Sequence, residues 1–217
     1  MAQNGQYISF KQKTELLENQ KKSSSILDVY YDHNKNTITK YIHSPEEMIL
    51  VTNQLGEIKI YYPTTNQVAY KQSDELSSSK NFIYYFSNNL TDDLGLENEG
   101  FNLMSRDYDS NYMVTIWKAP AELKLIDQVK MVYEGANPIY AEYTNLKGEI
   151  LKKIYYSHYT DFYSFRMPLR ITEVAFRSDG DSTLNRTIIS DVKVSTLPEN
   201  DYFNFKIPDD ALPIKPQ

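Results

Sequence analysis

Few side chains in this sequence belong to the types that perform catalysis or bind metals. The 217 residues include three histidines and no cysteine. His33, His43 and His158 have no metal-binding spacing to one another, so we expect no metal site and no cofactor. His158 precedes Asp161 by three residues, which is the best acid–base candidate that the chain offers. No phosphate loop or nucleophile elbow accompanies it, so we expect no catalytic residues and no enzymatic activity.

A second candidate for chemistry is the segment Ser178–Thr183, which reads SDGDST. Closely spaced carboxylates are typical of calcium loops, but the later glutamate and the further carboxylates of such a loop are missing. An Asp-Gly pair between two strand-like runs is the usual sequence of a hairpin turn. We therefore predict a turn around Gly180.

The charge pattern argues against a nucleic-acid partner. The net charge is −6, from 29 acidic and 23 basic residues. Basic residues cluster only as pairs such as Lys21-Lys22 and Lys152-Lys153, whereas nucleic-acid binding requires clustered cations that neutralise phosphates. No apolar run reaches the 18 or so residues of a membrane-spanning helix.

The elements that would position any site are predicted to be mostly strands. Residues 37–44 alternate Ile38, Lys40 and Ile42 with polar or aromatic neighbours, and strands at 48–52 and 57–62 flank a turn at Gly56. Turns recur every 8 to 12 residues or so, as in an antiparallel meander. The predicted fold class is mainly β with helices, in a single domain covering 1–217.

Three segments depart from this strand pattern. Residues 6–20 place apolar side chains at helical spacing and predict an amphipathic N-terminal helix. Residues 74–100 predict one or two helices inserted between strands, with Phe82 and Phe86 on the apolar face. Residues 201–217 predict a short aromatic strand followed by a Pro-rich tail that cannot extend a sheet.

The run Met48–Val51 is apolar without alternation, so this strand lacks a solvated face. The helical insertion also has an apolar face that it must bury. Two explanations stay open from these residues alone. Either the insertion closes a dry core, or part of the apolar surface holds a ligand.

The motifs along the chain resemble those of the LolA-type carriers of outer-membrane lipoproteins. Phe10-Lys11-Gln12 resembles the opening F-x-Q motif, and Ser44–Thr52 resembles the strand of type P-x-x-x-I-L-V-S. After the turn at Asn53–Gly56, Ile58–Val68 resembles the segment L-W-x-Y-x-P-x-x-x-Q. Asp201–Pro208 resembles the closing D-x-x-F-x-F-x-x-P. The resemblance spans nearly the whole chain.

This resemblance implies an unclosed antiparallel β-barrel, or half-barrel, with a helical lid. It implies a carrier of lipoproteins or other lipids in the periplasm, working toward outer-membrane biogenesis, with an inner-membrane lipoprotein-release complex and an outer-membrane receptor as partners. Met1–Asn4 fits a mature terminus left after signal-peptide removal, with Met1 added for expression. We expect a monomer.

The resemblance also implies an apolar cavity and lid that contact acyl chains. We predict that the following residues line them: Phe10, Leu17, Met48, Leu50, Ile58, Ile60, Tyr62, Phe82, Phe86, Met104, Met113, Trp117 and Met131. Family members hold the lid with an arginine after the first strand; this chain has no arginine there, and Lys35 or Lys40 could take its place.

Two other functions stay open. The same lipid-binding fold can serve as an envelope sensor or interaction module, which would bind a membrane-anchored regulator instead of passing cargo on. An enzyme acting on a lipid or glycan would need converging polar groups, for which His158 and Asp161 are the isolated candidates.

Overall fold

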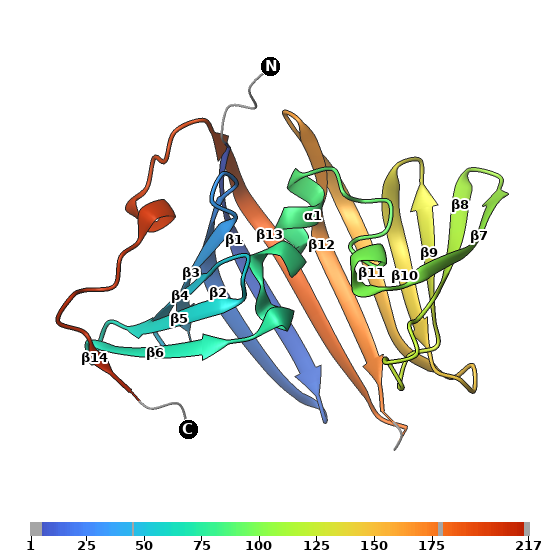
Figure 1. The fold of residues 1–217 in the computed structure, drawn as a ribbon, viewed down its shortest axis with the longest axis horizontal. Helices are drawn as coiled ribbons and strands as arrows, with labels where there is room; N and C mark the ends of the chain where they lie inside the picture. Colours follow the sequence, from blue (N-terminus) through green and yellow to red (C-terminus); the bar gives the residue numbers. More distant parts are fainter. Residues whose placement is uncertain (1–5, 45, 178–179, 215–217) are drawn as a thin grey trace. The chain divides into compact units, whose positions relative to one another are not determined.

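A computed structural model describes residues 6–44, 46–177 and 180–214 (Figure 1). The proposed mature terminus Met1–Asn4, together with Pro45 and Asp179, lies outside these residues. Within them the protein is mainly β, as the sequence predicts.

The described strands form one open, largely antiparallel sheet in the order β14-β6-β5-β4-β3-β2-β1-β13-β12-β11-β10-β9-β8-β7. Neighbours along the chain pair as hairpins over most of this order, and β14 joins β6 in parallel. The strands are β1 (Tyr7–Glu18), β2 (Lys21–Asp32), β3 (Thr37–Ser44), β4 (Met48–Thr52), β5 (Glu57–Tyr62), β6 (Gln67–Gln72), β7 (Asn102–Asp109), β8 (Tyr112–Lys118), β9 (Gln128–Glu134), β10 (Asn137–Thr144), β11 (Ile150–Phe162), β12 (Phe165–Phe176), β13 (Ser182–Ser195) and β14 (Leu212–Pro213).

The predicted N-terminal helix over 6–20 is wrong, because these residues form the long strand β1. Ile8 and Phe10 are both buried, and the side chains between and beside them are more exposed, which is the two-residue period of a strand. Tyr7, Phe10, Thr14 and Leu17 fall at helical spacing as well, so the local pattern is ambiguous. Sheet neighbours along the strand decide it, since tertiary pairing overrides local propensity.

The insertion over 74–100 is helical only in short pieces. It contains the 3-10 turns η1 (Asp74–Leu76), η2 (Ser78–Lys80) and η3 (Glu97–Glu99) and the six-residue helix α1 (Phe82–Ser87). Gly100 adopts a left-handed backbone with a φ of 84° and ends η3. A lid over a cavity mouth stays a prediction.

The C-terminal segment also differs from the prediction. Asp201–Asn204 form the 3-10 turn η4 instead of a strand, and the side chain of Asn200 accepts a hydrogen bond from the Tyr202 amide. The Pro-rich tail does extend the sheet, because the amides of Leu212 and Ile214 donate to the carbonyls of Asn66 and Val68. Pro213 lies between these two donors, at the sheet edge where proline is tolerated.

The chain divides into two compact units. Unit 1 contains residues 1–13, 25–85 and 189–217, and unit 2 contains residues 14–24 and 86–188. Each is described by itself below. The single domain over 1–217 stays a prediction.

In unit 1 the strand register sorts side chains onto two faces. Lys40 lies opposite Val29 on β2 and Leu50 on β4, and Leu50 lies opposite Ile60 on β5. Directly opposed residues point to the same side of a sheet. We call this side the Lys40 face. The alternate residues form the Tyr41 face: Asp28, Tyr30, Thr39, Tyr41, Ile49, Val51, Lys59 and Tyr61.

The first part of the insertion is fixed to the hairpin turns of unit 1 by serines. Ser77 Oγ donates to the Gln54 carbonyl at 2.8 Å, and Ser78 Oγ donates to the Asn36 carbonyl at 2.6 Å. Gly56 makes this approach possible, because a Cβ there would lie 2.4 Å from the Ser73 carbonyl oxygen. Its φ of 75° is a second reason for glycine.

In unit 2 a buried cluster covers one face of strands β8 to β10. It consists of Leu96, Phe101, Trp117, Val129, Met131, Tyr133 and Ala141. Leu96 and Phe101 come from the end of the insertion, so this segment contributes directly to the core of unit 2. Trp117 Nε1 donates to Thr115 Oγ1 at 2.9 Å, which satisfies the buried polar atom of the indole.

Candidate functional site

The Tyr41 face is covered by the chain's own C-terminal segment. We call residues 200–214 the strap; Figure 1 shows it in red between β13 and β14. Tyr202 stacks on Tyr30 and Tyr41 with ring centroids 5.1 and 5.2 Å apart, and Phe203 packs edge-on against Tyr7 and Tyr30. Such aromatic pairs stabilise by about 0.5–1.5 kcal/mol each beyond burial.

Polar contacts strengthen the strap at both ends. Lys35 Nζ donates to Asn204 Oδ1 at 2.5 Å, and Asn66 Nδ2 donates to Asp210 Oδ2 at 3.1 Å. Tyr41 itself donates to the Glu47 carboxylate, and this hydrogen bond raises the pKa of Tyr41 to about 12. The hydroxyl of Tyr41 is therefore protonated at physiological pH and remains a donor.

The Lys40 face is different, because part of it is apolar and only partly covered. Toward the hairpin turns it carries Tyr31, Ile38 and Ile58, each at most 2% exposed. The other part keeps intermediate exposure. We call this part the Lys40 surface; it comprises Lys40, Ile42, Met48, Leu50, Ile60 and Tyr62.

Lys40 lies among apolar side chains at the centre of this surface. Its cross-strand neighbours are Val29 and Leu50. No carboxylate or hydrogen-bond acceptor contacts it within residues 6–44, 46–177 and 180–214, and burial lowers the pKa of Lys40 from its ordinary value. A cation without a partner in a partly apolar surrounding costs free energy, because it loses some of its hydration without gaining an ion pair.

The insertion reaches the same face beside β1. Phe82 packs against Phe10 with ring centroids 5.8 Å apart, and Ile83 is completely buried. The predicted latch is absent among the described residues. Lys35 binds Asn204 and Asp32, and neither Lys35 nor Lys40 hydrogen-bonds to the insertion.

The structure brings several predicted ligand-binding residues together. Five share the Lys40 face of adjacent strands, and Phe10 and Phe82 form one aromatic pair. In unit 2, Trp117 and Met131 belong to the buried cluster, Met113 packs against it, and Phe86 packs against Tyr156 and Tyr159. The five on the Lys40 face are Met48, Leu50, Ile58, Ile60 and Tyr62.

Two predicted residues stand apart from these groups. Met104 on β7 is 65% exposed, and Leu17 on β1 is partly buried. A ligand-binding role for any of the predicted residues stays a prediction. Sequence reasoning did not place Lys40 and Ile42 among the ligand-binding residues, although the alternation Ile38-Lys40-Ile42 was the signal that could have done so.

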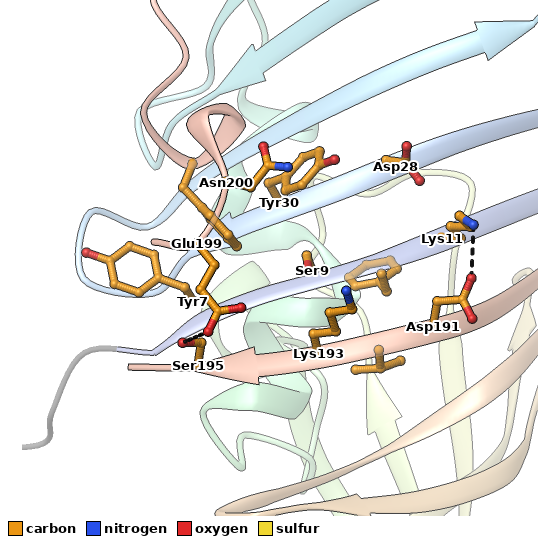
Figure 2. A pocket seen from close by; sticks show the side chains of 13 residues that line it. Tyr7, Ser9, Lys11, Asp28, Tyr30, Asp191, Lys193, Ser195, Glu199 and Asn200 are labelled. Carbon is orange, nitrogen blue, oxygen red and sulfur yellow. Dashed lines mark hydrogen bonds and ion pairs between the residues drawn. The ribbon is translucent and has the colours of Figure 1, made fainter. Parts of the chain in front are cut away.

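A groove lies on the Tyr41 side of unit 1, between the strap, β1 and β13 (Figure 2). This groove has a volume of about 570 Å³. Its walls mix aromatic with polar side chains: Lys11 pairs with Asp191 at 3.1 Å, and Ser195 Oγ donates to Glu199 at 3.2 Å. Both signs of charge line the groove, as in Lys193 and Glu199, so its charge does not single out one class of ligand.

The candidate acid–base pair is not assembled. His158 Nδ1 contacts Ser157 Oγ, whereas Asp161 pairs with Arg166 at 3.5 Å. Within the described residues no group of three or more potential metal ligands lies together. No helix in the described part of the chain is long and apolar enough to cross a membrane.

Comparison with known proteins identifies the class of fold. No protein-family model and no curated protein matches the sequence. Solved structures do: a LolA superfamily protein from Nitrosomonas europaea matches with a TM-score of 0.57 and 12% identity, over 93% of this chain and 91% of that one. A DUF1329 family protein from Desulfovibrio piger matches with 0.60 and 11%, over 93% and 90%.

A third structure, a Vibrio parahaemolyticus domain named for outer membrane lipoprotein sorting, matches with a TM-score of 0.58 and 12% identity, over 94% of this chain and 91% of that one. The chain therefore has a divergent LolA-like fold, which confirms the resemblance read from its motifs at the level of the fold. At identities of 11 to 12%, these similarities show the fold alone. The ligand has to be inferred from the residues of the site.

Proposed function

We propose that this protein binds the acyl chains of lipoproteins or of another lipid on the Lys40 face and carries them across the periplasm toward the outer membrane. The observation that supports this most is the Lys40 surface. Its apolar side chains stay partly exposed, whereas on the other face the rings of Tyr30 and Tyr41 are stacked against Tyr202 of the strap.

The physical gain from such binding is large enough to support a carrier. Each methylene group of an acyl chain that leaves water contributes about 0.8 kcal/mol. Met48, Leu50 and Ile60 offer contiguous apolar area for several such groups. Met48 is also unbranched and adaptable, so it can pack against chains of different shape.

The proposed partners follow from a carrier role. Cargo would be received from an inner-membrane lipoprotein-release complex and delivered to an outer-membrane receptor, and no enzymatic step is part of the proposal. The LolA-like fold supports this role, since one similar structure is named for outer membrane lipoprotein sorting.

The test uses an apolar fluorescent probe and a triacylated lipopeptide as its competitor. Wild-type protein is expected to bind the probe saturably and to release it when the lipopeptide is added. Leu50→Asp should weaken probe binding about tenfold or more, because it places a charge on the surface that the chain would cover.

Val51→Asp is the matched control. Val51 is the next residue on β4, is also partly exposed, and points to the Tyr41 face. It should leave probe binding unchanged, provided that both variants keep the wild-type circular dichroism spectrum. Equal loss in the two variants, or no probe uptake by wild type, would count against the proposed function. Capture of a membrane-anchored regulator without lipid uptake would favour the sensor role instead.

A further inference from the structure

We propose that the ligand of the Lys40 face carries a single carboxylate, as a free fatty acid does, and that Lys40 binds this head group. This inference rests on the proposed function, because it specifies the lipid that the same face would hold. Of the cargoes proposed above, the inference selects a lipid other than a lipoprotein, because the acyl chains of a lipoprotein are ester- or amide-linked and carry no free carboxylate.

The first argument is the position of Lys40. It occupies the middle of β3, with Val29 on one side and Leu50 on the other, and Ile38 and Ile42 precede and follow it on the same face. An amphiphile whose chain covers Met48 and Ile60 would therefore have an ammonium group within the surface that it covers. A purely apolar ligand would bury that charge further without compensation.

The second argument is that the charge of Lys40 is uncompensated. Within the described residues no carboxylate pairs with Lys40, whereas Lys11 pairs with Asp191 and Lys35 with Asp32; Lys59 and Lys71 also have no carboxylate partner but are exposed to solvent. Burial lowers the pKa of Lys40 from its ordinary value. A bound anion would supply the missing partner and would itself gain a charge-assisted hydrogen bond.

The third argument concerns the kind of anion. A phosphate group brings a larger or more diffuse charge and additional oxygens that need donors. The nearest residues on the face are aliphatic, and Lys71, the other lysine on this face, is exposed at the end of β6. One ammonium group among aliphatic side chains matches one carboxylate, so we commit to a fatty acid rather than to a phospholipid.

The experiment compares palmitate with hexadecanol, which has the same chain length and a neutral head group. Binding to the full chain is measured by displacement of the apolar probe, at ligand concentrations below aggregation. Wild type is expected to bind palmitate about tenfold more tightly than hexadecanol, the size expected of a buried charge-assisted contact.

The variants locate the effect. Lys40→Met should remove the preference for palmitate and keep or improve hexadecanol binding, whereas Lys40→Arg should retain the preference. Lys59→Met is the matched control, because Lys59 is an exposed lysine on β5 that points to the Tyr41 face. It should behave as wild type.

Each failure has its own meaning. Equal binding of palmitate and hexadecanol by wild type, or a preference that survives Lys40→Met, would overturn this inference and leave the proposed function standing. Absence of binding for both ligands and for the probe would overturn the proposed function as well. The same measurement is made with dioleoyl phosphatidic acid. If this lipid binds more tightly than palmitate, and Lys40→Met weakens its binding, the choice of a carboxylate is overturned.

Discussion

The two faces of the sheet in unit 1 are built from alternate residues of the same strands, and they are completed in different ways. On the Tyr41 face, Tyr30 and Tyr41 receive the ring of Tyr202 from the strap. On the Lys40 face, Leu50 stays partly exposed and Lys40 has no partner among the described residues. The strap thus packs against rings of the Tyr41 face, whereas no such aromatic stack lies on Leu50 or Lys40 among the described residues.

The two faces differ in what they contribute to the stability of the fold. Aromatic stacking and buried rings on the Tyr41 face favour a single folded arrangement. An apolar surface with an uncompensated cation does the opposite, because it costs free energy in the unliganded protein. Features that destabilise a fold locally are expected at binding sites, where a ligand offsets the cost.

The largest expected effect comes from breaking the Tyr41 face. Phe203→Ala removes a ring that is 6% exposed and packs against Tyr7 and Tyr30. The variant should lose about 3–5 kcal/mol of unfolding free energy, as for other buried phenylalanines. Chemical denaturation measures this loss. A loss of less than 1 kcal/mol or so would show that the strap does not hold this face.

A smaller loss is expected from disturbing the turn against which the insertion packs. Gly56→Ala combines a positive φ with a Cβ only 2.4 Å from the Ser73 carbonyl oxygen, and should cost about 2–3 kcal/mol. Gly148→Ala is the control, since Gly148 has a nearly equal φ of 76° but nothing within 4 Å of the added Cβ. It should cost about 1–2 kcal/mol, the penalty of the left-handed backbone alone. Equal losses in the two variants would contradict the close approach at Ser73.

A substitution on the Lys40 face should increase the unfolding free energy instead of lowering it. Lys40→Met removes a partly buried charge that has no partner among the described residues, and should raise the unfolding free energy by up to about 1 kcal/mol near neutral pH. Because burial lowers the pKa of Lys40, the folded state loses this proton before the unfolded state does as pH rises. The cost of the charge in the wild type therefore disappears as pH rises through the lowered pKa toward 10.5, and the advantage of the variant shrinks with it.

Denaturation curves of wild type and Lys40→Met at several pH values measure this trend. Lys59→Met again serves as the control, because Lys59 is exposed and should show neither the gain nor the trend. A destabilised Lys40→Met would mean that Lys40 has a stabilising partner in solution.

The smallest effect is expected at the edge of the strap. Tyr41→Phe removes the hydroxyl that donates to Glu47 and keeps the ring that stacks on Tyr202. The loss should be at most about 0.5 kcal/mol, because the hydrogen bond is exposed to solvent. In a spectrophotometric titration, the variant should lack a tyrosine that ionises near pH 12.

The same two faces show how far the sequence can predict the structure. Strong alternation, as in Ile38-Lys40-Ile42, and the turn residues around Gly56 predicted β3, β4 and β5 correctly. β1 was predicted as a helix, because Tyr7, Phe10 and Leu17 fall at helical spacing, whereas Ile8 and Phe10 follow the period of a strand, and only sheet partners distant in sequence decide between the two. The same holds for the strap, whose conformation depends on rings contributed by residues 7–41.

For the candidate site, sequence alone predicted Met48, Leu50 and Ile60 as ligand-contacting residues but could not show that they share a face. A shift of one residue in register would reverse every side chain. Lys40 was noticed only as a possible latch, since nothing local in the sequence indicates that a lysine lacks a partner. That information is present only once the neighbouring strands are placed.

The most direct test of the central claim uses methionine methyl groups as reporters of where an acyl chain lies. The protein is labelled with ¹³C in its methionine methyls and titrated with a fatty acid spin-labelled along its chain. Met48 lies on the Lys40 face, and Met104 is 65% exposed on β7 in unit 2. The account predicts strong, saturable broadening of the Met48 signal and little change at Met104. Broadening at Met104 with an unaffected Met48 would contradict it.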